Sequence, residues 1–434
     1  MDAMQSGILP AVGGCGKRTD MPKGNVMNRK ILTALSVVAV ALFSGWFTVR
    51  PLLVGAASEA SIPTFSTAEI GRQGHFYIGG HYVGEPGNET MHGAMYVEVW
   101  VPRNIRHPYP VVFITGGGGQ GAYALIQTPD GRPGWAYDFV NQGYTVYMMD
   151  YPGNGRSAYV VGVDGKVTPP RSGPLMEEVW SAGRSPESDW SKQQHILEHR
   201  NQEGANWPQF KKQTQWPGEG PNKGKMGDPV FDYFAKTELQ SASVAQDVTV
   251  DSIEQLLDAI GQPVILVFHS GMAATGWRVA DGRSQLVKGI IAAEPIGPPI
   301  QNAERGSTGP GLLWGLSNAP LHYDPPVKDP AELNPVREEK ADGPEVIPCW
   351  VQKEPARKLT NLVNIPVLDV AGEGSYHRPW AHCVAKWLNQ AGVKTTFVGL
   401  ETVGLPGNGH QLMSEKNSAG IAKFFMSWLD KSVR

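Results

Sequence analysis

Continuous apolar runs separated by segments of helical pattern constrain the fold of this chain more than any other feature. They lie in the segments PVVFIT (110–115), YTVYMMD (144–150), PVILVF (263–268), KGIIAAE (288–294), IPVLDVA (365–371) and KTTFVGL (394–400). A strand that is apolar on both sides must be covered on both faces, as in a parallel sheet with helices above and below it. The pattern therefore predicts an α/β domain.

Two earlier segments, HFYIGG (75–80) and AMYVEVWVP (94–102), alternate polar and apolar residues, which is typical of half-exposed antiparallel strands. Apolar periodicity predicts helices between and after the strands, over residues 135–142, 239–260, 272–281, 380–390 and 416–429. Together these elements predict one α/β domain over residues 62–434.

Two long stretches interrupt the alternation. Residues 158–236 are rich in Pro, Gly, Trp and Gln, and residues 297–362 are rich in Pro. Proline lacks the amide donor that a sheet needs, and loops of this length usually cover a binding site. We therefore interpret 158–236 as a lid insertion and 297–362 as a second excursion. Trp190, Trp207, Trp216 and Trp314 favour packed structure over a disordered insertion.

The first part of the chain has the order of an export signal. Residues 1–26 are interpreted as an upstream extension, and residues 27–57 as a signal peptide or an N-terminal anchor. Arg29 and Lys30 precede an apolar core, and small residues follow it near Ala57, as in a secretory signal peptide. The apolar stretch also approaches the roughly 18 to 20 residues that a membrane span needs. We expect a secreted or periplasmic protein.

Composition excludes several functions. With 38 basic and 41 acidic side chains, the net charge of -3 offers no broad electrostatic surface for nucleic acid. The cysteines, Cys15, Cys349 and Cys383, are too few and too widely spaced for a zinc site of the CxxC type. Export would allow a Cys349–Cys383 disulfide, the alternative being two buried thiols.

Chemistry-bearing residues follow several of the predicted parallel strands, at the edge where open α/β sheets place their active sites. A glycine loop, GGGGQG (116–121), follows the first of the continuous runs. Ser270, Glu294 and His410 then follow later strands, in the order serine, carboxylate, histidine. A serine becomes a nucleophile when a base takes its proton and a carboxylate orients that base.

With the glycine loop, DYPGNGRS (150–157), the corner PVILVFHSGMAATGW (263–277) and GNGH (407–410), the sequence resembles the α/β-hydrolase superfamily. IIAAEP (290–295) and LPGNGHQLMSEKNS (405–418) are more narrowly similar to secreted bacterial esterases. The resemblance covers nearly the whole chain from about residue 75. It implies an eight-stranded, mostly parallel sheet under a lid, and ester hydrolysis through an acyl-enzyme.

The resemblance assigns the nucleophile to Ser270 and the base to His410. In most of the superfamily the acid follows the seventh strand, where this chain has Glu373. In the esterase branch it ends the sixth strand, where this chain has Glu294. We prefer Glu294, followed by Glu373 and then Asp369, which lies inside its strand.

The oxyanion hole would use the backbone N–H groups of Gly271 and Gly117, with Gly118 as the alternative to Gly117. The usual Gly-x-Ser-x-Gly corner carries Phe268 and Met272 here, whose bulk could distort the turn. A better literal match to that pattern, GLSNA (315–319), has no buried strand before it.

These observations predict a secreted serine hydrolase that acts on a small-molecule ester without a metal or organic cofactor. No nucleic-acid partner is expected, and the resemblance allows a homodimer. Two alternatives stay open. The fold could support other chemistry, such as that of a lactone hydrolase or a lyase, or the chain could be a non-catalytic binding protein.

Overall fold

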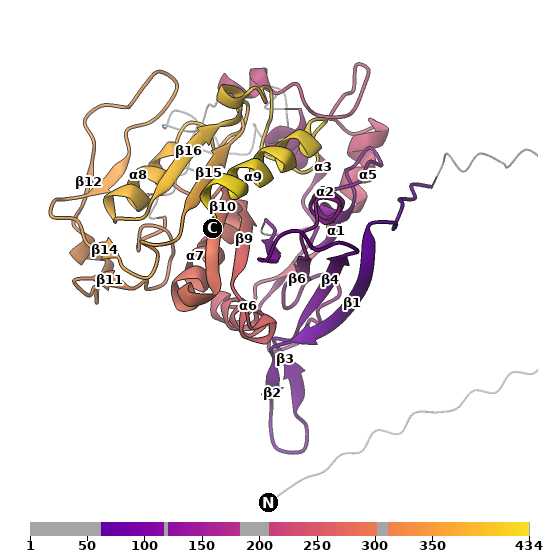
Figure 1. Cartoon of the computed structure of the whole chain (residues 1–434), viewed down its shortest axis with the longest axis horizontal. Helices are drawn as coiled ribbons and strands as arrows, with labels where there is room; N and C mark the ends of the chain where they lie inside the picture. The colour runs from indigo at the N-terminus through magenta and orange to yellow at the C-terminus, as the bar shows by residue number, and fades with distance from the viewer. Residues whose placement is uncertain (1–61, 117–119, 183–207, 302–310, 434) are drawn as a thin grey trace, which may run out of the picture. The chain divides into compact units, whose positions relative to one another are not determined.

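A computed structural model describes residues 62–433, except 117–119, 183–207 and 302–310. Its centre is an eight-stranded sheet (Figure 1). In spatial order the strands are β1 (Ile70–Ile78), β4 (Met95–Pro102), β6 (Val146–Asp150), β5 (Val111–Ile114), β9 (Val264–His269), β10 (Val287–Ala293), β15 (Val367–Ala371) and β16 (Thr395–Gly399). Only β4 runs against its neighbours, because β1 and β6 pair with it antiparallel and the later pairs are parallel. The predicted mostly parallel sheet is confirmed.

Helices cover both faces of the sheet, as the continuous apolar runs require. On one face, a core of buried side chains is formed with α6 (Gln246–Ile260), α7 (Ala273–Gly282) and α8 (His382–Gln390). On the other, α2 (Trp135–Asn141) and α9 (Ser418–Ser432) complete a second core, together with the short helix α1 (Tyr123–Ile126). Every residue of β9 is buried, which explains why its sequence shows no alternation.

One predicted helix starts later than expected. The pattern predicts a helix from residue 239, but α6 begins at Gln246. The preceding residues form β8 (Ser241–Ala242), which pairs antiparallel with β7 (Val167–Thr168). Ser243 N also donates to Lys166 O at 3.1 Å. These backbone hydrogen bonds to the predicted lid replace the first turns of the helix, a tertiary effect that apolar periodicity does not contain.

The described part of the predicted lid forms a small core together with Tyr376, which comes from outside the lid. It includes α3 (Gly173–Met176) and α5 (Pro229–Lys236). Asp228 caps α5 by accepting from Val230 N at 3.0 Å, and Pro229 suits the first turn of that helix. The core consists of Met176, Val179, Trp180, Trp216, Phe231, Phe234 and Tyr376. Trp216 is packed, as predicted, whereas residues 190 and 207 lie outside the described residues.

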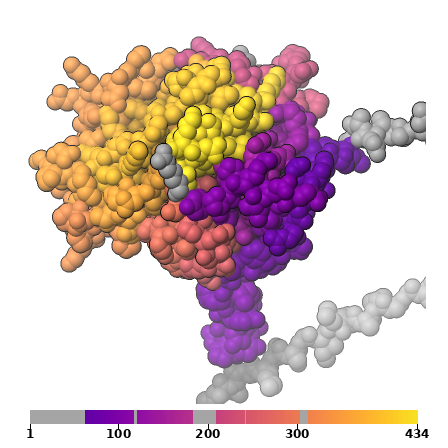
Figure 2. Space-filling view, in the orientation of Figure 1, coloured from indigo at the N-terminus to yellow at the C-terminus, as the bar shows by residue number. Residues whose placement is uncertain are grey.

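The second excursion adds short strands that pair with one another and not with the central sheet. They are β11 (Tyr323–Asp324) with β14 (Lys358–Leu359), and β12 (Pro335–Arg337) with β13 (Trp350–Gln352). A hairpin of β2 (His81–Val83) and β3 (Thr90–His92) stands away from the other described residues as a violet column in Figure 2.

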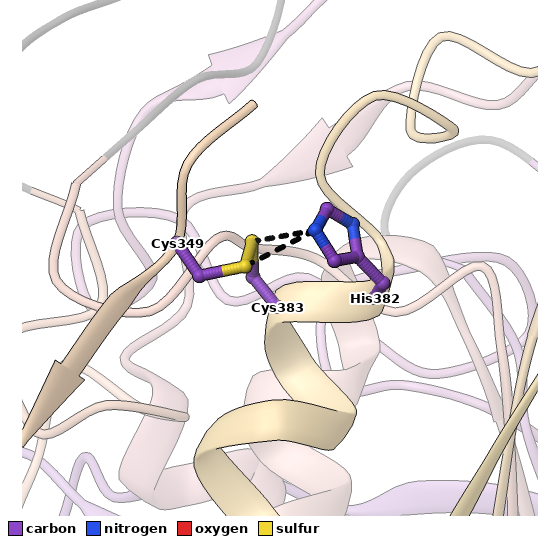
Figure 3. Close-up of side chains that lie close together, drawn as sticks. All are labelled: Cys349, His382 and Cys383. Atoms are coloured by element: carbon purple, nitrogen blue, oxygen red, sulfur yellow. Dashed lines mark hydrogen bonds between the residues drawn. A yellow bond between two sulfur atoms is a disulfide. The ribbon is translucent and has the colours of Figure 1, made fainter. Parts of the chain in front are cut away.

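The predicted Cys349–Cys383 disulfide is confirmed, and it joins the excursion to the first turn of α8 (Figure 3). The imidazole of His382 points at the two sulfur atoms, with its Nε2 3.2 Å from Cys349 Sγ. Both cysteines are fully buried.

Among the residues that the structure describes, no helix is long and apolar enough to cross a membrane. The predicted extension (1–26) and signal peptide or anchor (27–57) lie outside the described residues.

Candidate active site

Ser270 stands at the corner between β9 and α7, where the chain turns sharply from strand to helix. Its φ is 56°, in the left-handed region that side chains other than glycine seldom occupy. A 3-10 turn, Ser270–Met272, leads directly into α7. Strained backbone of this kind often marks a functional residue, because the surrounding structure must hold it in place.

The bulk of Phe268 at this corner is accommodated by a glycine that the sequence analysis did not single out. Phe268 is fully buried, and its ring packs edge-to-face against Trp277 at 4.7 Å. A Cβ atom at Gly276 would lie 2.3 Å from Phe268 Cδ1, so only glycine fits there without displacement. The close approach of strand and helix thus depends on Gly276, while Met272 packs at the margin of the core.

The three side chains predicted for catalysis form one line of hydrogen bonds. Ser270 Oγ lies 2.9 Å from His410 Nε2, and His410 Nδ1 lies 3.1 Å from Glu294 Oε2. His410 and Glu294 are buried, and Ser270 is partly exposed. The residues come from the ends of β9 and β10 and from the loop after β16, so the sheet edge brings the three side chains together.

The Glu294 carboxylate is held by the loop after β15. Gly372 N donates to Oε1, and Ser375 Oγ donates to Oε2 at 2.5 Å. Burial raises the pKa of Glu294 to about 7, while neighbouring His377 and these hydrogen bonds oppose that rise. Glu294 also has a positive φ of 53°, in the left-handed region. This is unusual, because the following Pro295 favours extended backbone at residue 294.

The two alternative acids do not bond to His410 in the structure. Glu373 accepts from Gly407 N at 3.1 Å and lies 3.9 Å from Lys212 Nζ. Asp369 is buried inside β15, and neither carboxylate oxygen has a hydrogen-bond partner among the described residues. Burial raises the pKa of Asp369 well above its usual range, and the nearby Glu294 carboxylate raises it further.

Three aromatic side chains surround the imidazole of His410. His269 donates from Nε2 to the His410 backbone carbonyl at 2.9 Å, and burial lowers the pKa of His269 well below the usual range. The rings of Tyr376 and His377 lie 4.6 Å and 4.4 Å from that of His410. The ring contacts themselves depend on how separate strand ends meet, which the sequence does not show.

A second buried carboxylate organises the loop that carries His410. Glu415 accepts from Gly409 N at 2.6 Å and from Asn408 Nδ2 at 2.6 Å. Asn408 and Asn417 exchange two further side-chain hydrogen bonds, at 2.6 Å and 2.9 Å. Burial raises the pKa of Glu415 to about 7. Glu415 belongs to the segment SEKN (414–417), and no spacing signal in the sequence identifies it as a support of the loop.

A small cavity of about 30 Å³ opens at Ser270. The residues lining it include Gln120, Ala124, Trp180, Ser270, His410 and Met413. Gly271 follows the serine, and a Cβ atom there would meet nothing within 4 Å, so its backbone is uncrowded. The other predicted oxyanion donor, Gly117, and its alternative, Gly118, lie outside the described residues.

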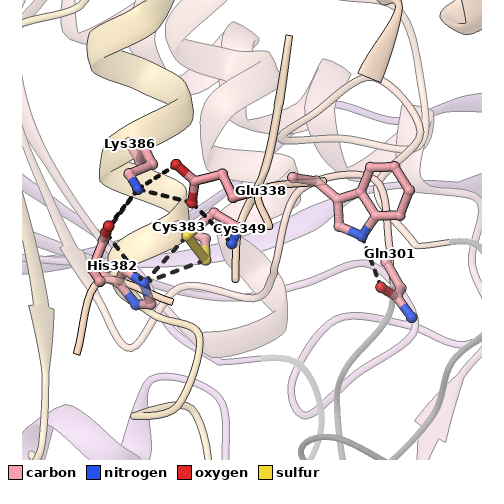
Figure 4. Close-up of a disulfide and its surroundings, with 8 residues drawn as sticks. Gln301, Glu338, Cys349, His382, Cys383 and Lys386 are labelled. Atoms are coloured by element: carbon pink, nitrogen blue, oxygen red, sulfur yellow. Dashed lines mark hydrogen bonds and ion pairs between the residues drawn. A yellow bond between two sulfur atoms is a disulfide. The ribbon is translucent and has the colours of Figure 1, made fainter. Parts of the chain in front are cut away.

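The side chains around the disulfide have metal-ligand types but are already engaged. The two sulfur atoms are bonded to each other, and Lys386 Nζ pairs with Glu338 (Figure 4). Lys386 Nζ also pairs with Asp342. We therefore assign no metal to this cluster.

No family model matches the chain. The sequence is 38% identical over 360 residues to the probable secreted lipase phiG from Fungal sp. (strain ATCC 74256), covering 82% of this chain and 89% of the relative. A solved bacterial esterase has the same fold, with a TM-score of 0.53 over 86% of this chain and 99% of that chain at 17% identity. The sheet order and the likeness to the solved esterase show the α/β-hydrolase fold. The identity to the probable secreted lipase shows that the chain belongs to the α/β-hydrolase superfamily, in the same family of carboxylic ester hydrolases as that lipase.

Proposed function

We propose that this protein hydrolyses carboxylic esters through a Ser270–His410–Glu294 triad and an acyl-enzyme. The observation that carries the proposal is the continuous hydrogen-bonded line from Ser270 Oγ through His410 to Glu294 Oε2. Each atom in the line has the partner that its role needs: the nucleophile faces a ring nitrogen, and the opposite nitrogen faces a carboxylate.

In the first half-reaction, His410 Nε2 accepts the proton of Ser270, whose Oγ attacks the ester carbonyl carbon. Glu294 keeps the proton on Nδ1 and stabilises the imidazolium. The Gly271 N–H, with Gly117 as the predicted partner, would bind the oxyanion. The C–O bond to the alcohol then breaks, and Nε2 returns the proton to the leaving oxygen.

In the second half-reaction, a water molecule gives its proton to His410 Nε2 and attacks the acyl carbon. The Ser270 Oγ–acyl bond breaks, and Ser270 takes the proton back. No metal or organic cofactor enters either half-reaction.

We propose that the substrate is a small-molecule ester and that the protein itself is exported from the cytoplasm. The relative is named a probable secreted lipase, which supports both an ester substrate and export. Membership in this family argues against the non-catalytic alternative. Mass spectrometry of exported protein tests export: a chain that begins near Ala57 supports it, and retention of residues 31–50 supports an anchor instead.

A fluorophosphonate probe tests the nucleophile. The wild-type protein should be labelled at one serine, and Ser270→Ala should lose both labelling and ester hydrolysis. Ser317→Ala is the matched control. Ser317 lies in the segment that fits the usual pattern better by letters, yet its Oγ accepts a hydrogen bond from the backbone N–H of Ala319 at 3.1 Å. Labelling that survives in Ser270→Ala and disappears in Ser317→Ala would refute the assignment.

A further inference from the structure

Two hydroxyl groups converge on the nitrogen of His410 that transfers the proton. Ser270 Oγ lies 2.9 Å from Nε2, and the hydroxyl oxygen of Tyr376 lies 3.4 Å from the same atom. The triad as proposed uses only the first of them. Tyr376 is therefore placed where chemistry occurs without having a role in the proposed steps.

The position of Tyr376 is determined by the loop that holds the triad acid. Its neighbour Ser375 donates to Glu294 Oε2, and His377 N donates back to Ser375 Oγ at 3.1 Å. Two consecutive residues thus act on opposite sides of the His410 imidazole. Ser375 binds the Glu294 carboxylate that faces Nδ1, and the Tyr376 hydroxyl lies near Nε2.

Packing holds the tyrosine ring firmly. Tyr376 is only 6% exposed and belongs to the core of the predicted lid, together with Trp180, which lines the cavity at Ser270. Its ring also meets that of His377 edge-to-face at 4.3 Å. A hydroxyl on so restrained a ring keeps its place during a reaction without further loss of side-chain entropy.

We propose that Tyr376 is a further catalytic residue, whose hydroxyl donates a hydrogen bond to the oxygen of the leaving alcohol. This inference rests on the proposed triad, in which His410 Nε2 gives its proton to that same oxygen. A group 3.4 Å from Nε2 is within reach of an atom hydrogen-bonded to Nε2. While the C–O bond breaks, charge develops on the leaving oxygen; the proton comes from Nε2, and Tyr376 keeps its own. In deacylation the attacking water takes the place of the alcohol.

The proposal makes Tyr376 matter most for alcohols that leave poorly. An alkoxide such as ethoxide needs protonation and hydrogen bonding as it leaves, whereas 4-nitrophenolate is stable without either. The test uses Tyr376→Phe with the ethyl, phenyl and 4-nitrophenyl esters of one acid that the wild-type enzyme accepts. kcat/KM is compared, because it reports the steps up to acylation.

In Tyr376→Phe, kcat/KM should fall at least about tenfold for the ethyl ester and less than about threefold for the 4-nitrophenyl ester, since hydrogen bonds to charged groups are the strong ones. The phenyl ester should lie between them. Tyr323→Phe is the matched control: it removes a hydroxyl of similar burial that bonds to Trp314 O and Trp387 Nε1, and it should leave the ratio unchanged.

An equal fall for all esters would show that the hydroxyl only positions His410, and this result, like the absence of any fall, would overturn the proposal. Tyr376→Met supplies the same comparison if Tyr376→Phe does not fold, as judged by thermal melting. Failure of the triad itself has a different signature, because Ser270→Ala would then retain hydrolysis of every ester in the series.

Discussion

Replacing Glu294 with glutamine tests the part of the proposed site that is least usual for the superfamily. Glu294 uses Oε1 for Gly372 N and Oε2 for both Ser375 Oγ and His410 Nδ1. A glutamine has the same shape, but it offers an oxygen on one side only. The substitution therefore changes hydrogen bonding while leaving the packing of this buried side chain unchanged.

Either orientation of the new amide removes a hydrogen bond from the site. If its oxygen faces Gly372, the NH2 group faces His410 Nδ1, and the imidazole must switch to the tautomer with the proton on Nε2, which cannot accept from Ser270. If its oxygen faces His410, the NH2 group opposes Gly372 N–H and leaves that buried donor unsatisfied, at a cost of about 1 to 3 kcal/mol. We expect kcat to fall about 100-fold to 10,000-fold, which corresponds to about 2.7 to 5.4 kcal/mol.

Steady-state ester hydrolysis measures the effect, with active sites counted by fluorophosphonate titration. KM should change little, because the lost interaction is strongest in the transition state. Glu373→Gln is the control: it makes the same chemical change next to Gly372, on a side chain bonded to Gly407 N, and it should change kcat less than about threefold. If Glu373→Gln proved the more damaging variant, the acid would belong to the loop after β15 and the assignment of Glu294 would be wrong.

Further predictions concern the pKa of Glu294, the packing at Gly276 and the disulfide. The raised pKa of Glu294, about 7 against an ordinary 4.5, means that kcat/KM should fall as pH drops below about 7. Because the folded pKa exceeds the unfolded one, the stabilisation from this group is complete below pH 4.5 and lost as pH rises through about 7, so urea unfolding of wild type and Glu294→Gln should diverge across that window. Gly276→Ala should lower the free energy of unfolding by about 1 to 3 kcal/mol through overlap with Phe268, and Phe268→Leu in the same chain should recover part of it; an unchanged urea midpoint would contradict the packing argument. Replacing Cys349 and Cys383 with alanine should cost about 3 to 4 kcal/mol, because the bond closes a loop across a separation of 34 residues, and a calorimetric melt that does not shift would count against this.

The sequence contains enough to predict the sheet, and it singles out the residues of the proposed triad, because both depend on local signals. A continuous apolar run indicates a buried strand, and in an open α/β sheet the active-site residues follow the ends of such strands. Ser270 follows an apolar run, and His410 ends the segment GNGH. In the structure Ser270 directly follows β9, and His410 lies in the loop after β16. The order of β9, β10 and β15 in the sheet then brings Glu294 beside the loop of His410.

The supports of the site could not be predicted, because they depend on contacts between distant segments. Gly276 reads as an ordinary weak point of a helix until Phe268 is seen against it. Glu415 reads as a surface residue of a polar segment, yet it is buried under the histidine loop. The late start of α6 has the same origin, since strand pairing with residues about 75 positions earlier replaces its first turns.

The position of the proposed acid, Glu294, also explains why the loop after β15 has its particular residues. β10 lies between β9 and β15, so an acid at its end starts one strand closer to Ser270 than an acid after β15 would. Neighbouring strands are about 4.8 Å apart, and the left-handed φ of Glu294 redirects the chain there instead of continuing the strand. A Cβ atom at Gly372 would lie 2.4 Å from Gly409 O, so the loop after β15 closes too tightly on the histidine loop to carry a side chain at that point. That loop instead contributes the Gly372 N–H and the Ser375 hydroxyl to Glu294, and the two strand ends together do what one loop does in most of the superfamily.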